Sequence, residues 1–302
     1  MCAIKMNTKV TIGLCAKNSA KILRTAFHSI TIQDYSHKLI KLVIVNDNST
    51  DNTLTLAKEF AQETDISTLV ISSSGEGLGT ARQIVVDNAE GDYIVWIDDD
   101  LVLTSDYVKN QVEFMEKNPN VGAARGGYDD VSTNHIVDII NYALLVPSKQ
   151  SKLKTIGTGG SIFRLKALEK INGFDVQIKG AGEDQDVSHR IRESGWKLAI
   201  NDSSRLHQKY PPTTPKSLWK KNFGYGYGNH FLFHKYKNQK SLMQYFPPFA
   251  LLVGLRMTRQ IYRVTKMKKV FVFSILYSFA MFAQSIGFER SHLDEYGHVK
   301  KI

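Results

Sequence analysis

Short apolar runs of strand length alternate with segments of helical spacing over the first hundred residues of the chain. The apolar runs predict a first strand that leads into a polar loop over 8–18 and further strands at 39–45, 68–71 and 93–97. The segments between them predict helices at 19–30, 53–63 and 80–89. This β-α-β order predicts an α/β fold with a mostly parallel sheet, flanked by helices and joined by right-handed crossovers. The polar residues that interrupt the pattern fall at strand ends, where open sheets of this kind bind ligands.

The run at 93–97 ends in three carboxylates, Asp98, Asp99 and Asp100. Alternation along an extended chain points Asp98 and Asp100 the same way and Asp99 the other way. Because adjacent like charges repel, the triplet shares a cation, or at least one carboxylate has a raised pKa or turns into water. Oxygen ligands suit Mg²⁺ or Mn²⁺ carrying a phosphorylated substrate. A solvated acidic turn is the alternative.

The composition predicts a globular chain without a disulfide or zinc scaffold. The 302 residues, 42% of them hydrophobic, suffice for one large α/β domain and an appendage. Cys2 and Cys15 are the only cysteines, which fits a reducing cytosol. The first five residues lack the pattern of a signal peptide, so we expect the catalytic part on the cytosolic side.

The net charge of +10 is concentrated in the C-terminal third of the chain. Residues 1–204 hold 22 Lys or Arg against 26 Asp or Glu, whereas 205–302 hold 17 against 3. The same tail carries uncharged apolar runs at 245–255 and 270–288. Nineteen helical residues span about 28 Å, close to a hydrocarbon core of ~30 Å. The cations between the runs would be attracted by anionic lipid of the cytosolic leaflet.

The tail is therefore predicted to be a basic and apolar, helical, membrane-associating region that anchors the protein at the cytoplasmic face of a membrane. A nucleic-acid-binding arm is disfavoured, because such arms lack long apolar runs. A buried helix of a soluble domain is the alternative for 270–288. A single span and a returning hairpin both stay open.

Five motifs in order resemble the family-2 glycosyltransferases, which have the nucleotide-sugar-binding GT-A fold. They are the first strand and loop ending at Asn18, the segment 45–51, the segment 79–82, the pair Asp98 and Asp100, and the segment 180–184. The resemblance covers roughly residues 8–210, which divides the chain into a catalytic domain, 1–210, and a C-terminal membrane-associated region, 211–302. It implies transfer of a sugar from a nucleoside diphosphate donor with inversion at the anomeric carbon.

On the donor side, the resemblance implies that Asp98 and Asp100 hold the divalent cation, Mn²⁺ or Mg²⁺, and that Asp98 also reaches the donor ribose. His207 is a candidate third ligand, with an ordinary loop histidine as the alternative. The donor itself would be bound by three further residues. Ala16 would contribute backbone groups, and the Asp47 carboxylate can accept a hydrogen bond from the N3–H of uracil or thymine. Arg82 would contact the base or a phosphate, with an ordinary surface charge as the alternative reading. The chain departs from the family in having Cys15 and Lys17 in the first loop and Asn46 before Asp47, which bears on the nucleotide base.

On the acceptor side, the attacking hydroxyl needs a general base. The resemblance implies that Asp184 is that base, with capping of the helix that begins at Glu183 as the alternative reading. The glycines at 157–160 resemble the acceptor-side strand, where a sugar approaches the backbone closely. The alternation of aromatics and glycine over 219–230 predicts a loop that closes over the diphosphate or meets lipid headgroups.

The leading functional hypothesis is an inverting glycosyltransferase that uses a nucleotide-sugar donor, with UDP as the expected nucleotide, and extends a lipid-linked saccharide or other glycan acceptor. A polyprenyl-phosphate sugar synthase is the nearest rival; its acceptor is already ionised and needs no base, so Glu183 and Asp184 argue against it. A non-catalytic binding protein, or a nucleic-acid binder, is disfavoured by the set Asp98, Asp100 and Asp184.

Overall fold

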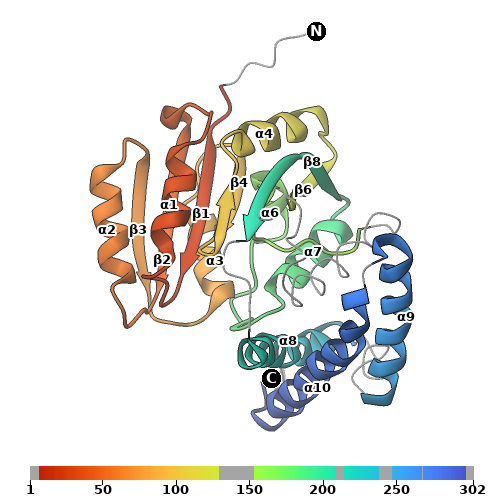
Figure 1. Ribbon diagram of the computed structural model, residues 1–302. Coiled ribbons are helices and arrows are strands. Elements are labelled where there is room, and N and C mark those ends of the chain that lie inside the picture. Colours follow the sequence, from red (N-terminus) through yellow and green to blue (C-terminus); the bar gives the residue numbers. More distant parts are fainter. Residues whose placement is uncertain (1–6, 129–152, 209–213, 238–246, 267, 297–302) are drawn as a thin grey trace. The chain divides into compact units, whose positions relative to one another are not determined.

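The structure is a computed structural model that describes residues 7–128, 153–208, 214–237, 247–266 and 268–296 (Figure 1). The described residues cluster into two compact units. The first holds residues 7–128, 153–179 and 183–208, and the second holds 180–182 and the described residues from 214 onward. The predicted boundary between 210 and 211 lies outside the described residues, so that division remains a prediction.

The first unit is built on one sheet with strand order β3-β2-β1-β4-β7-β6-β8-β5 (Figure 1). Its strands are β1 Val10–Ala16, β2 Ile40–Asp47, β3 Ser67–Ser73, β4 Tyr93–Asp98, β5 Leu101–Leu103, β6 Val121–Tyr128, β7 Ser161–Arg164 and β8 Lys197–Gln208. β1 to β4 pair in parallel, as does β6 with β8, while β7 runs antiparallel to β4 and β6 and β5 antiparallel to β8. The expected mostly parallel sheet is confirmed.

Helices accompany the sheet. They are α1 Leu23–Thr31, α2 Thr53–Glu63, α3 Leu78–Asp87, α4 Tyr107–Lys117, α6 Leu165–Lys170 and α7 Glu183–Glu193, with the 3₁₀ turn η1 His37–Leu39. Among them, α1, α2, α3 and α7 lie at or near the positions predicted from the sequence, whereas α4 and α6 were not predicted. The N-cap of α2, Asn52, makes no side-chain cap hydrogen bond, but the carboxylate of the preceding residue, Asp51, accepts from the Thr53 backbone N–H at 3.0 Å. The same carboxylate accepts from the Ala20 N–H at 3.1 Å, which ties the loop after β1 to the loop after β2.

Alternate residues of the central strands enter two different cores. Leu42 and Ile44 of β2 lie in one core with side chains of α1 and α4, while Val43 and Val45 lie in the other with side chains of α3 and α7. β4 divides likewise, with Val95 and Ile97 in the first core and Ile94 and Trp96 in the second. A strand buried on both faces has no polar side, which explains its unbroken apolar sequence. The residue after Ile97 falls on the side of α3 and α7.

The second unit consists of helices. They are α8 Pro215–Tyr236, α9 Pro247–Thr265, the 3₁₀ turn η4 Lys268–Val272 and α10 Phe273–Leu293. The loop predicted for 219–230 is wrong, because this segment lies inside α8. Its glycines serve close packing instead: a Cβ on Gly226 would lie 1.9 Å from the Gln284 carbonyl oxygen of α10, and one on Gly287 would lie 2.1 Å from the Phe223 carbonyl oxygen.

Val270–Leu293 is, among the described residues, the one stretch long and apolar enough to cross a membrane, and 39% of its most apolar window is buried within the protein. Several large apolar side chains of α9 and of this stretch are nonetheless exposed. They are Phe249, Leu251, Leu252, Val253 and Leu255 on α9, and Phe271, Val272, Ile275, Phe282, Ile286 and Leu293 beyond it.

Candidate active site

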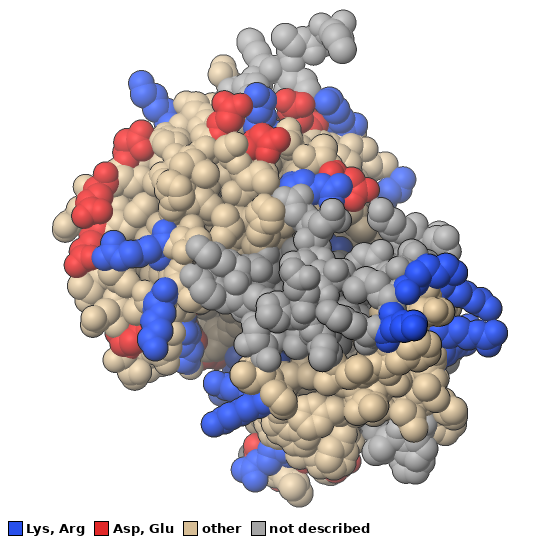
Figure 2. Space-filling model, viewed as in Figure 1, with Lys and Arg blue, Asp and Glu red and all other residues tan. Residues whose placement is uncertain are grey.

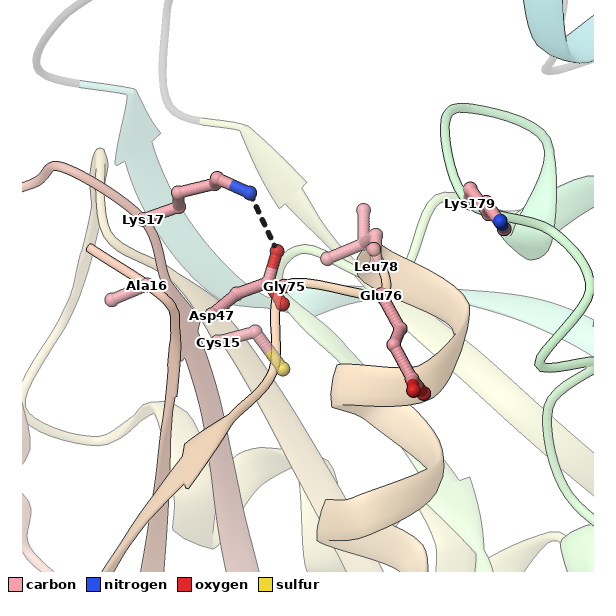
Figure 3. A pocket seen from close by; sticks show the side chains of 9 residues that line it. Cys15, Ala16, Lys17, Asp47, Gly75, Glu76, Leu78 and Lys179 are labelled. Carbon is pink, nitrogen blue, oxygen red and sulfur yellow. Dashed lines mark hydrogen bonds and ion pairs between the residues drawn. The ribbon is translucent and has the colours of Figure 1, made fainter. Parts of the chain in front are cut away.

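A pocket of about 300 Å³ opens at the carboxyl ends of β1 and β2 (Figure 3). Its lining includes Ala16 and Asp47, both predicted to bind the donor, and also Cys15, Lys17, Gly75, Glu76, Gly77, Leu78 and Lys179. The volume is at the lower end of the range for small-molecule sites, about 300–1,000 Å³. The two predicted nucleotide contacts therefore meet in one hollow, although they are far apart in the sequence.

Asp47 is held at the floor of this pocket by two neighbours. Lys17 Nζ lies 3.1 Å from one carboxylate oxygen, as the dashed line in Figure 3 shows, and the Ser73 hydroxyl donates to the other oxygen at 2.7 Å. An ionised carboxylate offers about four lone-pair sites, so each oxygen can accept one bond more. Lys17, at a position where the sequence departs from the family, thus orients the carboxylate that is expected to face the base.

The glycine-rich turn before α3 is shaped by its neighbours along the 175–179 segment. The N–H groups of Leu78 and Gly79 donate to the carbonyls of Lys179 and Ile178, and a Cβ on Gly77, whose φ is +103°, would lie 2.1 Å from the Lys179 carbonyl oxygen. Only glycine fits this approach. The turn therefore fixes where α3 begins and brings Lys179 to the pocket.

Arg82 of α3 is buried and joins two acidic residues. Its Nη1 donates to Glu183 Oε1 at the start of α7, and its Nη2 lies 3.3 Å from Asp98 Oδ1 at the end of β4. The guanidinium also lies 5.9 Å from the centre of the Trp96 ring. With 4% of the residue exposed, the surface-charge reading of Arg82 is wrong. Its predicted contact with base or phosphate stays a prediction, since the charged partners of Arg82 in the structure are the carboxylates of Glu183 and Asp98.

Neighbouring carboxylates of the acidic triplet have different partners. Asp98 meets Arg82, on the α3 side, and its side chain is 44% exposed, so it is open to a ligand. Asp99 instead accepts from the Ser19 hydroxyl in the loop after β1. Burial raises the pKa of Asp99 to about 6, and the neighbouring charges of Asp100 and Asp98 add to the rise. The expectation that at least one carboxylate has a raised pKa or turns into water is therefore met at Asp99.

Glu183 and Asp184 are adjacent acids at the start of α7, and they have different hydrogen-bond partners. Burial raises the pKa of Glu183 to about 7 against the opposing effect of Arg82, and its buried Oε2 has no hydrogen-bond partner within the described residues. Burial also raises the pKa of Asp184. The Asp184 carboxylate accepts from the N–H of the next residue, Gln185, at 2.7 Å. An acid with a raised pKa in a site is a better proton acceptor near neutral pH than a free one.

The glycines before β7 connect the two acidic positions. A Cβ on Gly159 would lie 2.3 Å from Asp98 Oδ2, and one on Gly157 would lie 3.8 Å from Asp184 Oδ2. The segment 157–159 thus places one glycine beside the carboxylate at the end of β4 and another near the carboxylate at the start of α7, with the buried Thr158 between them. An acceptor could lie along this backbone and contact both carboxylates.

His207 lies within β8, which extends to Gln208, so the alternative reading as a loop histidine is wrong. The register pairs His207 with Val102 of β5, two residues beyond Asp100. The ligand atoms of Asp98, Asp100 and His207 do not form a trio within 4.8 Å of one another; in the described chain that distance is met by a different set, in the second unit. The oxygen-rich pair Asp98 and Asp100 suits Mg²⁺ or Mn²⁺. The metal assignment, with His207 as third ligand, stays a prediction.

The sequence profile of "Glycosyl transferase family 2" matches residues 11–172, more than half of the chain, and that of "Glycosyl transferase family group 2" matches residues 93–286. The chain belongs to glycosyl transferase family 2. The expectation of a glycosyltransferase is confirmed at this level.

Curated relatives of this glycosyltransferase are distant. The poly-beta-1,6-N-acetyl-D-glucosamine synthase of Staphylococcus epidermidis is 24% identical over 230 residues, which cover 73% of this chain and 54% of that protein. The probable glycosyltransferase YdaM of Bacillus subtilis is 22% identical over 280 residues, which cover 85% of this chain and 66% of that protein. The chain spans about half the length of the synthase it matches.

Solved structures confirm the expected GT-A type of fold. The mannosyltransferase PcManGT from Pyrobaculum calidifontis, in complex with GDP-Man and Mn²⁺, superposes with a TM-score of 0.70 at 17% identity, covering 96% of this chain and 88% of that chain. S. aureus TarS 1-349, in complex with UDP-GlcNAc, has a TM-score of 0.52 at 12% identity, covering 95% of this chain and 92% of that chain.

Several side chains of this site were not predicted to act there. Lys17, Ser19 and Ser73 each follow or end a strand at the same sheet edge, and that position was their signal in the sequence. The pairing of Glu183 with Arg82 had no such signal, because 101 residues separate them.

Proposed function

We propose that this glycosyltransferase moves a sugar from a nucleoside diphosphate to a hydroxyl of a lipid-linked saccharide or other glycan, with inversion. One observation carries the proposal: Gly159 lies against the carboxylate of Asp98, Gly157 lies near the carboxylate of Asp184, and Arg82 links Asp98 to the residue before Asp184. A donor-side acid and an acceptor-side acid thus share one site. Inversion requires such a pair, because the hydroxyl attacks opposite the leaving diphosphate.

Asp184 would accept the proton of the attacking hydroxyl. A sugar hydroxyl is a weak nucleophile, so a base poised near the working pH accelerates its attack. Burial, which raises the pKa of Asp184, moves this carboxylate toward that range. Glu183, held by Arg82, would position Asp98 and the start of α7 and would itself carry a proton part of the time.

Asp98 and Asp100 would hold a divalent cation, Mn²⁺ or Mg²⁺, with His207 as a further ligand. The cation, when bound, stabilises the negative charge that grows on the leaving diphosphate. The donor set supports this assignment, because Asp98 is open to a ligand and Gly159 leaves room at its Oδ2. The structural neighbour PcManGT was solved with Mn²⁺.

The donor would be of the UDP type. The Asp47 carboxylate in the pocket can accept from the N3–H of uracil, while Lys17 and Ser73 hold it in orientation. Ala16 would offer backbone groups, and Arg82 would reach base or phosphate only by exchanging a carboxylate partner. The similarity to a poly-beta-1,6-N-acetyl-D-glucosamine synthase and to TarS in complex with UDP-GlcNAc supports this choice. The similarity to PcManGT, which was solved with GDP-Man, instead favours guanine as the base.

We place the enzyme at the cytoplasmic face of a membrane. The second unit combines exposed apolar side chains on α9 with the exposed cations Arg256, Arg259 and Arg263 of the same helix. Figure 2 shows Lys and Arg side chains gathered over the part that Figure 1 draws as α9. Apolar contact and attraction to anionic lipid act together on such a helix. No nucleic-acid partner is proposed.

The test is a screen of purified protein for hydrolysis and transfer over a panel of nucleotide sugars, each with Mn²⁺ or Mg²⁺. We expect turnover with at least one uridine donor and none in excess chelator. Asp47→Asn should weaken binding of UDP more than that of GDP, because a neutral amide oxygen accepts a weaker hydrogen bond from the uracil N3–H than a carboxylate does. Equal losses for both nucleotides would contradict the uracil assignment.

A further inference from the structure

Three histidines of the second unit gather where the end of α10 meets α8. His230 and His234 lie one turn apart on α8, and His292 lies in the last turn of α10. One ring nitrogen from each lies within 4.8 Å of the other two. Among the described residues this is the trio of His, Cys, Asp or Glu side chains that meets this distance. It is separate from the carboxylates to which the catalytic cation was assigned.

The pair on α8 already has the spacing of two metal ligands. His230 Nε2 and His234 Nε2 lie 3.1 Å apart. A tetrahedral zinc ion with Zn–N bonds of about 2.0 Å keeps its ligand atoms about 3.3 Å apart. Two imidazoles at i and i+4 reach this spacing because residues four apart lie on one face of a helix.

The surroundings of His230 fix which nitrogen can bind. This histidine is 1% exposed, and its Nδ1 lies 2.8 Å from the Tyr296 carbonyl oxygen. A carbonyl only accepts, so Nδ1 carries the proton and Nε2 presents its lone pair toward His234. A ligating histidine characteristically donates its other ring N–H to such an oxygen, which sets the tautomer and the ring orientation. The Ser291 hydroxyl, 3.1 Å from the same Nδ1, adds a second partner.

His292 can complete the set by a change of rotamer. Its side chain is exposed, and its ring centre lies 5.5 Å from that of His230. Tyr227 of α8 holds the end of the helix that carries His292. Its hydroxyl donates to Asp294 Oδ2 at 3.2 Å, and its ring stacks on that of Tyr296. A ligand on an anchored helix end loses little freedom on binding.

We infer that His230, His234 and His292 bind a transition-metal ion, Zn²⁺ by the chemistry of the site, and that the ion clamps the end of α10 to α8. Imidazole nitrogens select Zn²⁺, Cu²⁺ or Ni²⁺ over the oxygen-preferring Mg²⁺, Mn²⁺ and Ca²⁺. Three protein ligands leave a fourth position for water. This role is structural and independent of the catalytic cation.

The experiment uses the full chain without a polyhistidine tag, in detergent and in excess Mg²⁺, which occupies oxygen sites. Zn²⁺ affinity is measured by competition with a chromophoric chelator, and Co²⁺ is added separately to read ligand geometry from its visible absorption. We expect one Zn²⁺ per chain, the absorption of a tetrahedral Co²⁺ site and a raised thermal midpoint.

His292→Ala and His234→Ala should each weaken Zn²⁺ binding by ~10²-fold or more, since even a lost outer partner costs 10- to 100-fold. His28→Ala, at an exposed histidine of the first unit, is the matched control and should bind as the wild type does. His292→Ala changes an exposed side chain, so the variant should fold, and its thermal midpoint without zinc checks that. Unchanged Zn²⁺ affinity in the double variant His234→Ala, His292→Ala, or the octahedral Co²⁺ spectrum in the wild type, would overturn the inference.

Discussion

At the scale of single residues, the position of each carboxylate along β4 and the turn after it determines which partner that carboxylate contacts. Asp98 falls on the side of α3 and α7 and meets Arg82, while Asp99 takes the Ser19 hydroxyl of the loop after β1. The same alternation divides Trp96 and Ile97 between the two cores. The sequence alone predicted this division. It could not predict Arg82 as the partner, because that contact depends on how α3 packs.

The first prediction concerns the triplet. Asp100→Asn should lower turnover by ~10²-fold or more, the scale of losing a group that stabilises transition-state charge. Asp99→Asn should cost less, because an amide oxygen can still accept from Ser19. Its thermal stability at neutral pH should rise, since a buried acid with a raised pKa stabilises the folded state below about pH 4 and loses that contribution as pH rises to about 6.

The measurements are steady-state kinetics with added Mn²⁺ and thermal midpoints of both variants from pH 4 to pH 8. Wild-type protein in chelator is the reference for complete loss of the cation. An Asp100→Asn variant that keeps full activity in that chelator would contradict the metal assignment.

The second prediction tests the base. Asp184→Asn keeps shape and donor binding but cannot take a proton, so turnover should collapse while affinity for the nucleoside diphosphate stays nearly unchanged. In the wild type the acidic limb of kcat/KM should lie above the ordinary range of an aspartate, about 3.9, because burial raises the pKa of Asp184. The rate falls as pH drops through that pKa, since only the ionised form accepts the proton.

Glu183→Gln is the matched control, with the same loss of charge one residue away. It should retain more turnover, but it breaks a buried pair with Arg82, for which about 3–5 kcal/mol of unfolding free energy is typical. Calorimetric binding of the nucleotide and the anomeric configuration of the product by NMR complete the test. Wild-type transfer by Asp184→Asn would favour a phosphate acceptor, which is ionised without a base.

At the scale of elements, local pattern predicted the first half of the sheet and its helices, and α2 has the predicted bounds, 53–63. Pattern failed at α8. Three glycines within five residues have low helix propensity and read as a loop, yet the helix forms because α10 packs on it at a distance that only glycine permits. Tertiary packing of this kind leaves no local signal, and the same holds for the extension of β8 to His207.

The third prediction separates the low helix propensity of glycine from its role in close packing between α8 and α10. Gly226→Ala should lower the thermal midpoint, since its Cβ would lie 1.9 Å from the Gln284 carbonyl oxygen and the backbone cannot yield without moving α10; overpacking typically costs ~1–3 kcal/mol. Gly224→Ala, with nothing within 4 Å of the new Cβ, should instead stabilise α8 by up to about 1 kcal/mol. Thermal melts followed by circular dichroism give both values. Equal effects of the two substitutions would refute close packing at Gly226.

At the scale of the whole molecule, charge is segregated along the chain, with 17 Lys or Arg against 3 Asp or Glu over residues 205–302. Membrane association was predicted from composition alone, because it depends on amounts of charge and apolar surface, and it stays a prediction. Composition could not separate a span from a surface helix, since this depends on which side chains neighbouring helices bury. α10 meets the length and hydropathy of a span and is in part buried by α8 and α9, and α9 has exposed apolar and cationic side chains.

The last prediction distinguishes attachment by α9 from a span by α10. Arg256, Arg259 and Arg263, all exposed, are changed together to Glu. Each cation near an anionic surface contributes about 1 kcal/mol, so binding to phosphatidylserine vesicles at low salt should fall by ~10²-fold or more. The difference from the wild type should shrink at 1 M salt, where screening acts within ~3 Å. Vesicle flotation measures it, with vesicles of phosphatidylcholine alone as reference.

The matched control changes Lys38, Lys58 and Lys166, exposed cations of the first unit, to Glu and alters the net charge by the same amount. If attraction acts through α9, the control should bind nearly as the wild type does; equal losses would mean that only the net charge matters. A spanning α10 would hold the α9 variant in detergent-extractable membranes at every salt concentration, because insertion of a long apolar helix does not depend on charge screening. Release of the variant at low salt would instead show that α9 attaches the enzyme and that α10 serves as the packed helix beneath it.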